Sequence, residues 1–125
     1  MTDVKTPVSP RALLLLLNIS ITLQVVMGIA LWMGYAQGMR NAHMAIGVVF
    51  VVLLWAIAGF ALAKRHRPGL AVLAIVWGLV IAGFGMVQTT LLVGDLHWVV
   101  KVAHLVIGLV AMPMAELLAK RKVAA

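Results

Sequence analysis

Two short stretches of the chain repeat the same spacing of a basic residue, a histidine and a glycine. They read RNAHMAIGVV at 40–49 and KVAHLVIGLV at 101–110, and each opens an apolar run that ends in Leu-Ala-Lys-Arg. In each copy the histidine follows the basic residue by three positions and precedes the glycine by four. A neutral imidazole is a good axial ligand for haem iron. We therefore expect His43 and His104 to ligate one metal centre together, with haem iron as the leading candidate.

The neighbours of the two histidines fit the same chemistry. Residues four apart on a helix share a face, so Gly47 and Gly108 leave space for a flat ring one turn from each imidazole. We expect Gly28, Gly78, Gly83 and Gly85, in two other apolar segments, to leave space in the same way. The basic residues of the repeat lie one turn on the other side of the histidines, where they can pair with haem propionates. They are Arg40 and Lys101.

Other roles for these side chains are open from the sequence alone. A histidine within the membrane can hydrogen-bond a neighbouring helix or handle a metal ion or a proton, and glycines in membrane helices often only permit close packing. His97 precedes His104 by seven residues, about 10 Å along a helix, which is too far for it to bind the same iron. It can instead contact a quinone or another substrate, exchange protons, or lie at the membrane surface without a role.

The composition is that of a membrane protein. Of 125 residues, 65 % are apolar and only 10 % are charged, which is far from the balance of a soluble globular domain. The absence of cysteine excludes disulfides, thiolate metal sites, iron–sulfur clusters and covalently attached c-type haem. The formal net charge of +7 comes from basic residues at the ends of apolar segments, so it indicates membrane orientation and not nucleic-acid binding.

Four apolar segments are each near the roughly 20 residues that a helix needs to cross the hydrocarbon core. We expect helices at 12–33, 41–63, 70–93 and 97–119, preceded by a polar tail at 1–11 and followed by a basic tail at 120–125. The histidine repeat recurs at an offset of 61 residues, so the second and fourth helices run in the same direction. The prediction is an all-α integral membrane protein, a four-helix bundle made of two tandem helical hairpins.

Basic residues predict the orientation of this bundle. With four spans, eight basic residues fall on one side: Lys5, Arg11, Lys64, Arg65, Arg67, Lys120, Arg121 and Lys122. Only Arg40 and Lys101 fall on the other side. Because cytoplasmic segments are enriched in lysine and arginine, we expect both termini in the cytoplasm and the chain as a multi-pass protein of the inner (plasma) membrane. The histidines then lie near the outer face.

The chain resembles known haem proteins of membranes. One histidine on the second helix and one on the fourth, the phrase QVVMG at 24–28, and AH at 42–43 with AHL at 103–105 are similar to one half of heme A synthase. The plan also resembles small membrane b-type cytochromes, including the cytochrome b561 and ferric reductase-like groups. The resemblance implies haem ligation by His43 and His104. Heme A synthase has a glutamate one turn before a ligating histidine, where this chain has the basic residues of the repeat, which argues against the synthase activity.

The leading hypothesis is a b-type cytochrome that binds one haem b near the outer face and transfers single electrons. A quinone or an outer-side redox protein is the expected partner, and electron transfer is favoured over catalysis. The first alternative is a haem-handling or haem-modifying relative of heme A synthase. The second is a non-haem metal or proton transporter, or an accessory membrane subunit. The lipid bilayer surrounds the bundle in each case, a homo-oligomer is compatible with all three, and no nucleic acid is expected.

Binding of one haem by both histidines sets a geometric condition. The imidazole nitrogens of two axial ligands must lie about 4 Å apart across the iron. His43 is 21 residues from Lys64 but His104 is 16 from Lys120, which places the two about 7 Å apart in depth. Helix tilt, unequal helix ends or a kink at Pro113 must absorb this difference.

Overall fold

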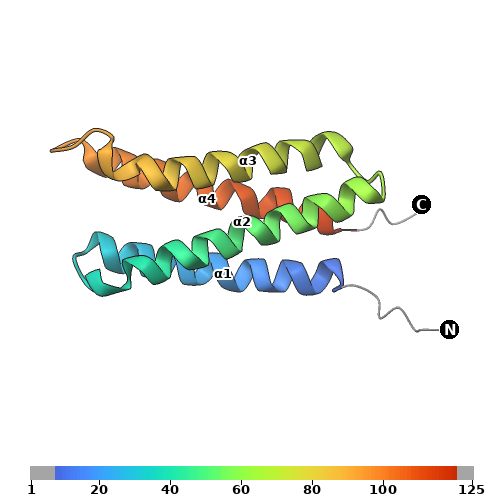
Figure 1. The fold of residues 1–125 in the computed structure, drawn as a ribbon, viewed down its shortest axis with the longest axis horizontal. Coiled ribbons are helices and arrows are strands. Elements are labelled where there is room, and N and C mark those ends of the chain that lie inside the picture. The colour runs from blue at the N-terminus through green and yellow to red at the C-terminus, as the bar shows by residue number, and fades with distance from the viewer. Residues whose placement is uncertain (1–7, 121–125) are drawn as a thin grey trace.

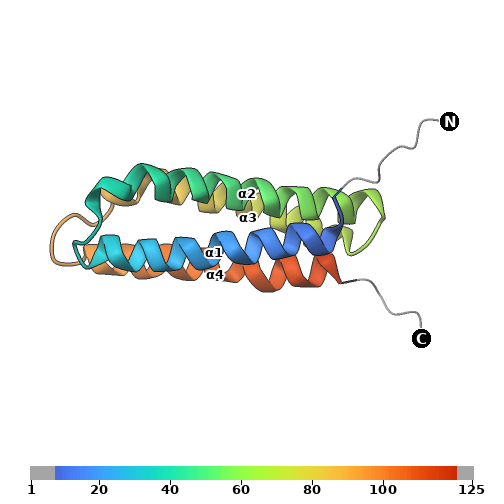
Figure 2. The same cartoon turned by 90° about the horizontal axis from the view of Figure 1, so that it is seen from below.

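The computed structural model describes residues 8–120, and in this part of the chain every long element is an α-helix. The helices α1 (Pro10–Trp32), α2 (Arg40–Ala63), α3 (Pro68–Val87) and α4 (His97–Ala119) run up and down in succession (Figures 1 and 2). Two short 3₁₀ helices, η1 (Gln37–Met39) and η2 (Gln88–Thr90), lie in the connections at one end. The fold is the expected all-α bundle of two tandem hairpins.

All four long helices are long and apolar enough to cross a membrane. Their outward faces expose large apolar side chains, for example Val26 on α1, Val48 on α2, Leu79 on α3 and Val106 on α4. Soluble monomeric proteins rarely expose apolar surface of this extent. The arrangement is therefore that of a multi-pass membrane protein whose outer surface contacts lipid.

Proline and a capping serine explain where α1 and α3 begin. Ser9 accepts a hydrogen bond from the backbone N–H of Ala12 at 3.2 Å, and Pro10 follows at the first helical position. Proline is favoured there because the N–H that it lacks would have no partner within the helix. Pro68 opens α3 in the same way. Both helices consequently begin two residues before the starts that their apolar runs predict.

The end of α3 lies earlier than the sequence predicts. The helix ends at Val87 and continues as η2 only to Thr90, whereas the apolar run extends to residue 93. Thr90 donates its hydroxyl hydrogen to the carbonyl oxygen of Val87 at 2.7 Å, which competes with helical bonding of that segment. Leu92 and Gly94 then adopt positive φ angles of 43° and 111°, so the chain turns towards α4.

The two ends of the bundle differ in charge. The basic end is formed by the start of α1, the α2–α3 turn and the end of α4, and lies at the right in Figure 1. The opposite, histidine end contains η1 and the α3–α4 connection. Five exposed basic residues lie at the basic end: Arg11, Lys64, Arg65, Arg67 and Lys120. Lys5, Arg121 and Lys122, and with them most of the two predicted tails, lie outside the described residues.

Nearly all of the buried apolar side chains lie in one half of the bundle. The basic half comprises residues 8–21, 50–81 and 111–120, and the histidine half comprises residues 22–49 and 82–110. Leu17 on α1 and Leu54 on α2 are 0 % exposed, as are Ala74 on α3 and Ala115 on α4. All of the hydrophobic core lies in the basic half: Leu13, Leu17, Ile21, Phe50, Val51, Leu54, Ile57, Ala58, Ala61, Ala71, Ala74, Ile81, Ala111, Met114, Ala115 and Leu118.

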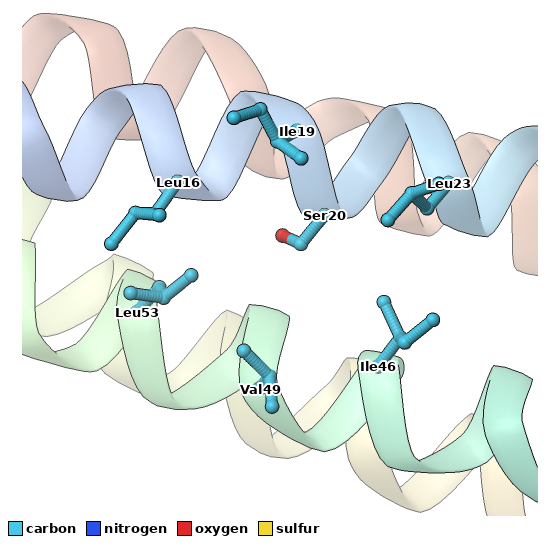
Figure 3. Close-up of a pocket in the computed structure, with 7 residues that line it drawn as sticks. All are labelled: Leu16, Ile19, Ser20, Leu23, Ile46, Val49 and Leu53. Carbon is cyan, nitrogen blue, oxygen red and sulfur yellow. The ribbon is translucent and has the colours of Figure 1, made fainter.

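A groove on the outer surface between α1 and α2 lies apart from the histidines. It has a volume of about 260 Å³, and side chains of α1 and α2 line it from its two sides (Figure 3). Ser20 is its one polar residue, and the Ser20 hydroxyl donates to the carbonyl oxygen of Leu17 at 2.8 Å. The lining is Leu16, Ile19, Ser20, Leu23, Ile46, Val49 and Leu53. Such an apolar groove suits a lipid acyl chain and offers no reactive group.

Candidate functional site

The two helices that carry the repeated histidines meet across the bundle. Of the two diagonal helix pairs, α2 and α4 are in contact, whereas α1 and α3 are not. His43 and His104 both lie half-buried in the histidine half, and the Nδ1 atom of each is buried without a hydrogen-bond partner. The structure therefore directs both imidazoles into the same part of the bundle interior.

His43 lies over a glycine of the preceding helix. Its Cε1 atom is 3.4 Å from the position that a Cβ atom at Gly28 would occupy. Gly28 is on α1 and His43 is on α2, so the imidazole packs at van der Waals distance from this position of α1. The residue is the glycine of the QVVMG phrase of the first span.

His104 has a matching environment in the second hairpin. Its Cε1 atom is 3.5 Å from the Cβ position of Gly85 on α3. The ring of Phe84 stacks on the imidazole, with ring centroids 6.0 Å apart and planes 13° apart. A Cβ atom added to Gly83, another glycine expected from the sequence, would meet nothing within 4 Å. The structure thus places Gly85, and not Gly83, against His104.

Gly47 and Gly108 lie one turn from the histidines, as the repeat predicts, and each faces α1. A Cβ atom at Gly47 would lie 2.5 Å from Nε2 of Gln24, and one at Gly108 would lie 3.9 Å from Cδ1 of Ile21. The space that these glycines leave is thus occupied by side chains of α1. Their direct role in the structure is close approach of α1 to α2 and to α4.

The basic residues of the repeat lie towards the histidine end. Arg40 is the first residue of α2 and is exposed. The Nζ atom of Lys101 lies 5.7 Å from the ring centroid of Trp32, within the range of a cation–π contact between α4 and α1. Among the described residues the only ion pair is Glu116–Lys120, at the basic end, so neither cation is neutralised by a carboxylate.

His97 belongs to the α3–α4 connection and not to the pair of facing imidazoles. Its Nδ1–H donates to the carbonyl oxygen of Leu91 at 3.0 Å, since a carbonyl can only accept. Leu91 is part of an apolar groove of about 310 Å³. The groove is lined by Phe84, Leu91, Leu92, Val99, Val100 and Ala103. His97 therefore fixes one wall of this groove, and Phe84 connects the groove to His104.

Two tryptophans join the helices that hold the site. The indole N–H of Trp55 on α2 donates to the carbonyl oxygen of Ile75 on α3 at 3.0 Å. The indole N–H of Trp77 on α3 donates to the carbonyl oxygen of Ile107 on α4 at 2.9 Å. These bonds link α2 to α4 through α3. A tryptophan deep within an apolar run needs a partner for its N–H, which is the signal in the sequence that could have indicated such links.

The two imidazoles are fewer protein ligands than a bare metal ion needs. The described residues contain no group of three or more histidine, cysteine, aspartate or glutamate side chains that could hold a metal ion. Protein sites for a bare ion such as zinc use at least three protein ligands. Haem brings four ring nitrogens of its own and needs only one or two axial ligands from the protein. Two imidazoles on facing helices match that requirement.

Comparisons with protein-family models, with curated proteins and with solved structures found no match for this chain. Its function is therefore inferred from the residues and the geometry of the histidine half.

Proposed function

We propose that this chain is a membrane b-type cytochrome that binds one haem b between His43 and His104 and transfers single electrons. The observation that carries the proposal is the pair of imidazoles on two parallel helices that contact each other, each with a buried Nδ1 atom that lacks a partner. Leaving a buried polar atom unpaired costs about 1–3 kcal/mol. Two such atoms in one small region favour a bound group that orients both rings.

The surrounding residues support this assignment. His43 and His104 would hold the iron, and their ring edges lie against Gly28 and Gly85, which leave room for the imidazoles. When bound, haem supplies a one-electron redox couple, and two histidine ligands leave no coordination position open for a substrate. The stacked ring of Phe84 keeps the His104 side of the site apolar. These features suit electron transfer more than catalysis at the iron.

The charges at the two ends support an orientation. Arg40 and Lys101 lie towards the histidine end, where their cationic groups would pair with haem propionates. The exposed basic residues of the basic end satisfy the positive-inside rule if that end faces the cytoplasm. We accordingly place the protein in the inner (plasma) membrane, with both termini cytoplasmic and the haem near the outer face.

A quinone is the partner that the surroundings of His104 favour. The apolar groove beside α3 and α4 is bordered by Phe84, whose ring stacks on the imidazole of His104. Membrane quinones are apolar, flat and soluble in lipid, and such molecules enter clefts lined by apolar and aromatic side chains. An outer-side redox protein is the other partner class that would reach this end of the bundle.

Reduced-minus-oxidised absorption spectra of purified protein test the proposal. We expect wild type to show the sharp, split bands of haem with two histidine ligands, and His43→Ala and His104→Ala to lose them. His66→Ala is the matched control, because His66 lies at the basic end and contacts the carbonyl oxygen of Leu117. Colourless wild type after haem-replete expression, or unchanged haem in His43→Ala, would contradict the proposal. A five-coordinate spectrum would instead favour a haem-handling protein.

A further inference from the structure

Two successive levels of the α1–α2 interface each pair a glycine with a polar side chain. At one level the His43 ring lies over Gly28, with Cε1 3.4 Å from the Cβ position. One turn towards the basic half, the Gln24 amide lies over Gly47, with Nε2 2.5 Å from the Cβ position. Residues four apart share a helix face, so these four residues form the corners of a square between the two helices. The Gln24 amide and the His43 imidazole are at opposite corners, and Gly28 and Gly47 are at the other two.

The unpaired atoms of these two side chains are chemically complementary. Oε1 of Gln24 and Nδ1 of His43 are both buried and have no hydrogen-bond partner. An amide oxygen only accepts, whereas Nδ1 donates when it carries the proton of the neutral imidazole. Gly28 and Gly47 carry no side chain, so neither would obstruct a hydrogen bond between these two atoms.

We infer that Gln24 is a positioning residue for His43: its amide oxygen accepts the Nδ1–H of His43 when Nε2 of that imidazole binds haem iron. This inference rests on the proposed function. Metal-binding histidines nearly always donate their second ring N–H to an oxygen acceptor, which fixes the tautomer and the ring orientation and makes the ligand more basic. One hydrogen bond would then satisfy two of the buried atoms that lack a partner.

The second hairpin lacks an equivalent acceptor. Gly85 of α3 lies against His104 as Gly28 lies against His43, but the residue one turn before Gly85 is the apolar Ile81. Nδ1 of His104 is also buried without a partner. The two imidazoles are therefore inequivalent, and His43 is the one whose ligand strength depends on a neighbouring amide.

Titration of the full-length apoprotein with haem, together with redox titration of the haem-loaded protein, tests this role. Gln24→Met keeps the length of the side chain but removes the acceptor, so we expect about 10-fold weaker haem binding and a raised midpoint potential. Gln24→Glu keeps an acceptor, so we expect haem binding close to that of wild type and a lowered midpoint potential. Asn18→Leu removes another buried amide oxygen of α1 that is remote from His43, and should change neither quantity.

The outcomes separate this inference from the proposed function. If wild type binds haem and Gln24→Met matches Asn18→Leu in both affinity and midpoint potential, the role of Gln24 is wrong and the proposed function stands. If Gln24→Met does not fold, a midpoint potential of Gln24→Glu equal to that of wild type would also overturn it. If wild type binds no haem, the proposed function fails and the inference fails with it.

Discussion

The basic half and the histidine half of the bundle are built on different principles. In the basic half all four helices contribute fully buried apolar or small side chains, such as Leu17, Leu54, Ala74 and Ala115. In the histidine half Val100 is the only described hydrophobic residue that is buried. Glycine, histidine and glutamine are among the residues that face neighbouring helices there. It follows that the tightly packed core lies in the basic half, and the looser packing of the histidine half is consistent with the proposal that it holds a bound group.

The same division explains where buried polar atoms are tolerated. Three of the four buried side-chain atoms without a partner belong to the histidine half: Gln24 Oε1, His43 Nδ1 and His104 Nδ1. The buried serine of the basic half, Ser20, bonds to a backbone carbonyl of its own helix. Unpaired buried polar atoms destabilise a fold, so their concentration in one half favours a binding role for that half.

Truncation of the core should produce the largest difference between the halves. Leu54→Ala removes a side chain that is 0 % exposed, and we expect it to lower the free energy of unfolding by about 2–5 kcal/mol. Leu105→Ala, at a half-buried position beside His104, should lower it by much less. Reversible unfolding in mixed micelles measures both. Equal losses would show that the histidine half is packed as tightly as the basic half.

Removal of haem should loosen one half only. A ligand at 100 times its dissociation constant stabilises the folded state by about 2.7 kcal/mol. We expect backbone amides of residues 43–49 and 99–108 to exchange hydrogen faster in the apoprotein than in the haem-loaded protein. Amides of residues 50–61 should exchange alike in both, because the hydrophobic core of α2 lies there. Mass spectrometry measures these exchange rates. An equal change of the rates in both halves on removal of haem would contradict this division.

Two glycines of α3 provide a matched pair on either side of the boundary. Gly78→Val places a side chain against the indole of Trp55, and we expect overpacking to cost about 1–3 kcal/mol of unfolding free energy. Gly83→Val meets nothing within 4 Å and should be close to neutral. The same unfolding measurement compares them. A larger loss for Gly83→Val would mean that the outer part of α3 has a partner in the membrane.

Loss of one interhelical hydrogen bond should have the smallest effect. Trp77→Phe keeps an aromatic ring but removes the N–H that donates to the carbonyl oxygen of Ile107. We expect the free energy of unfolding to fall by about 0.5–1.5 kcal/mol. Because this bond helps to set the spacing of α3 and α4, haem affinity should fall slightly as well. A variant with unchanged stability and unchanged haem affinity would remove Trp77 from the framework of the site.

Much of the fold could be predicted from the sequence because apolar runs and their basic flanks are local signals. The second and fourth helices were expected at 41–63 and 97–119, and they are observed at Arg40–Ala63 and His97–Ala119. The third was expected to reach residue 93 but ends at Val87. Hydropathy alone does not detect this end, because the residues after the Gln-Thr-Thr segment are again apolar.

The site could be predicted only in part, since helical spacing defines faces but not the register between helices. The repeat correctly places Gly47 and Gly108 one turn from the histidines, yet Gln24 and Ile21 of α1 occupy the space beside them. Gly85 faces His104 because of the α3–α4 register, which no local pattern encodes. The haem, its ligation and the redox partner stay predictions.

Low-temperature electron paramagnetic resonance of oxidised wild-type protein, with haem counted per chain, tests the shared site of His43 and His104. We predict one haem per chain and a low-spin ferric signal, because two imidazoles fill both axial positions. A high-spin ferric signal would contradict ligation by both histidines. Protein that carries no haem after haem-replete expression would contradict the assignment of the histidine half as a haem site.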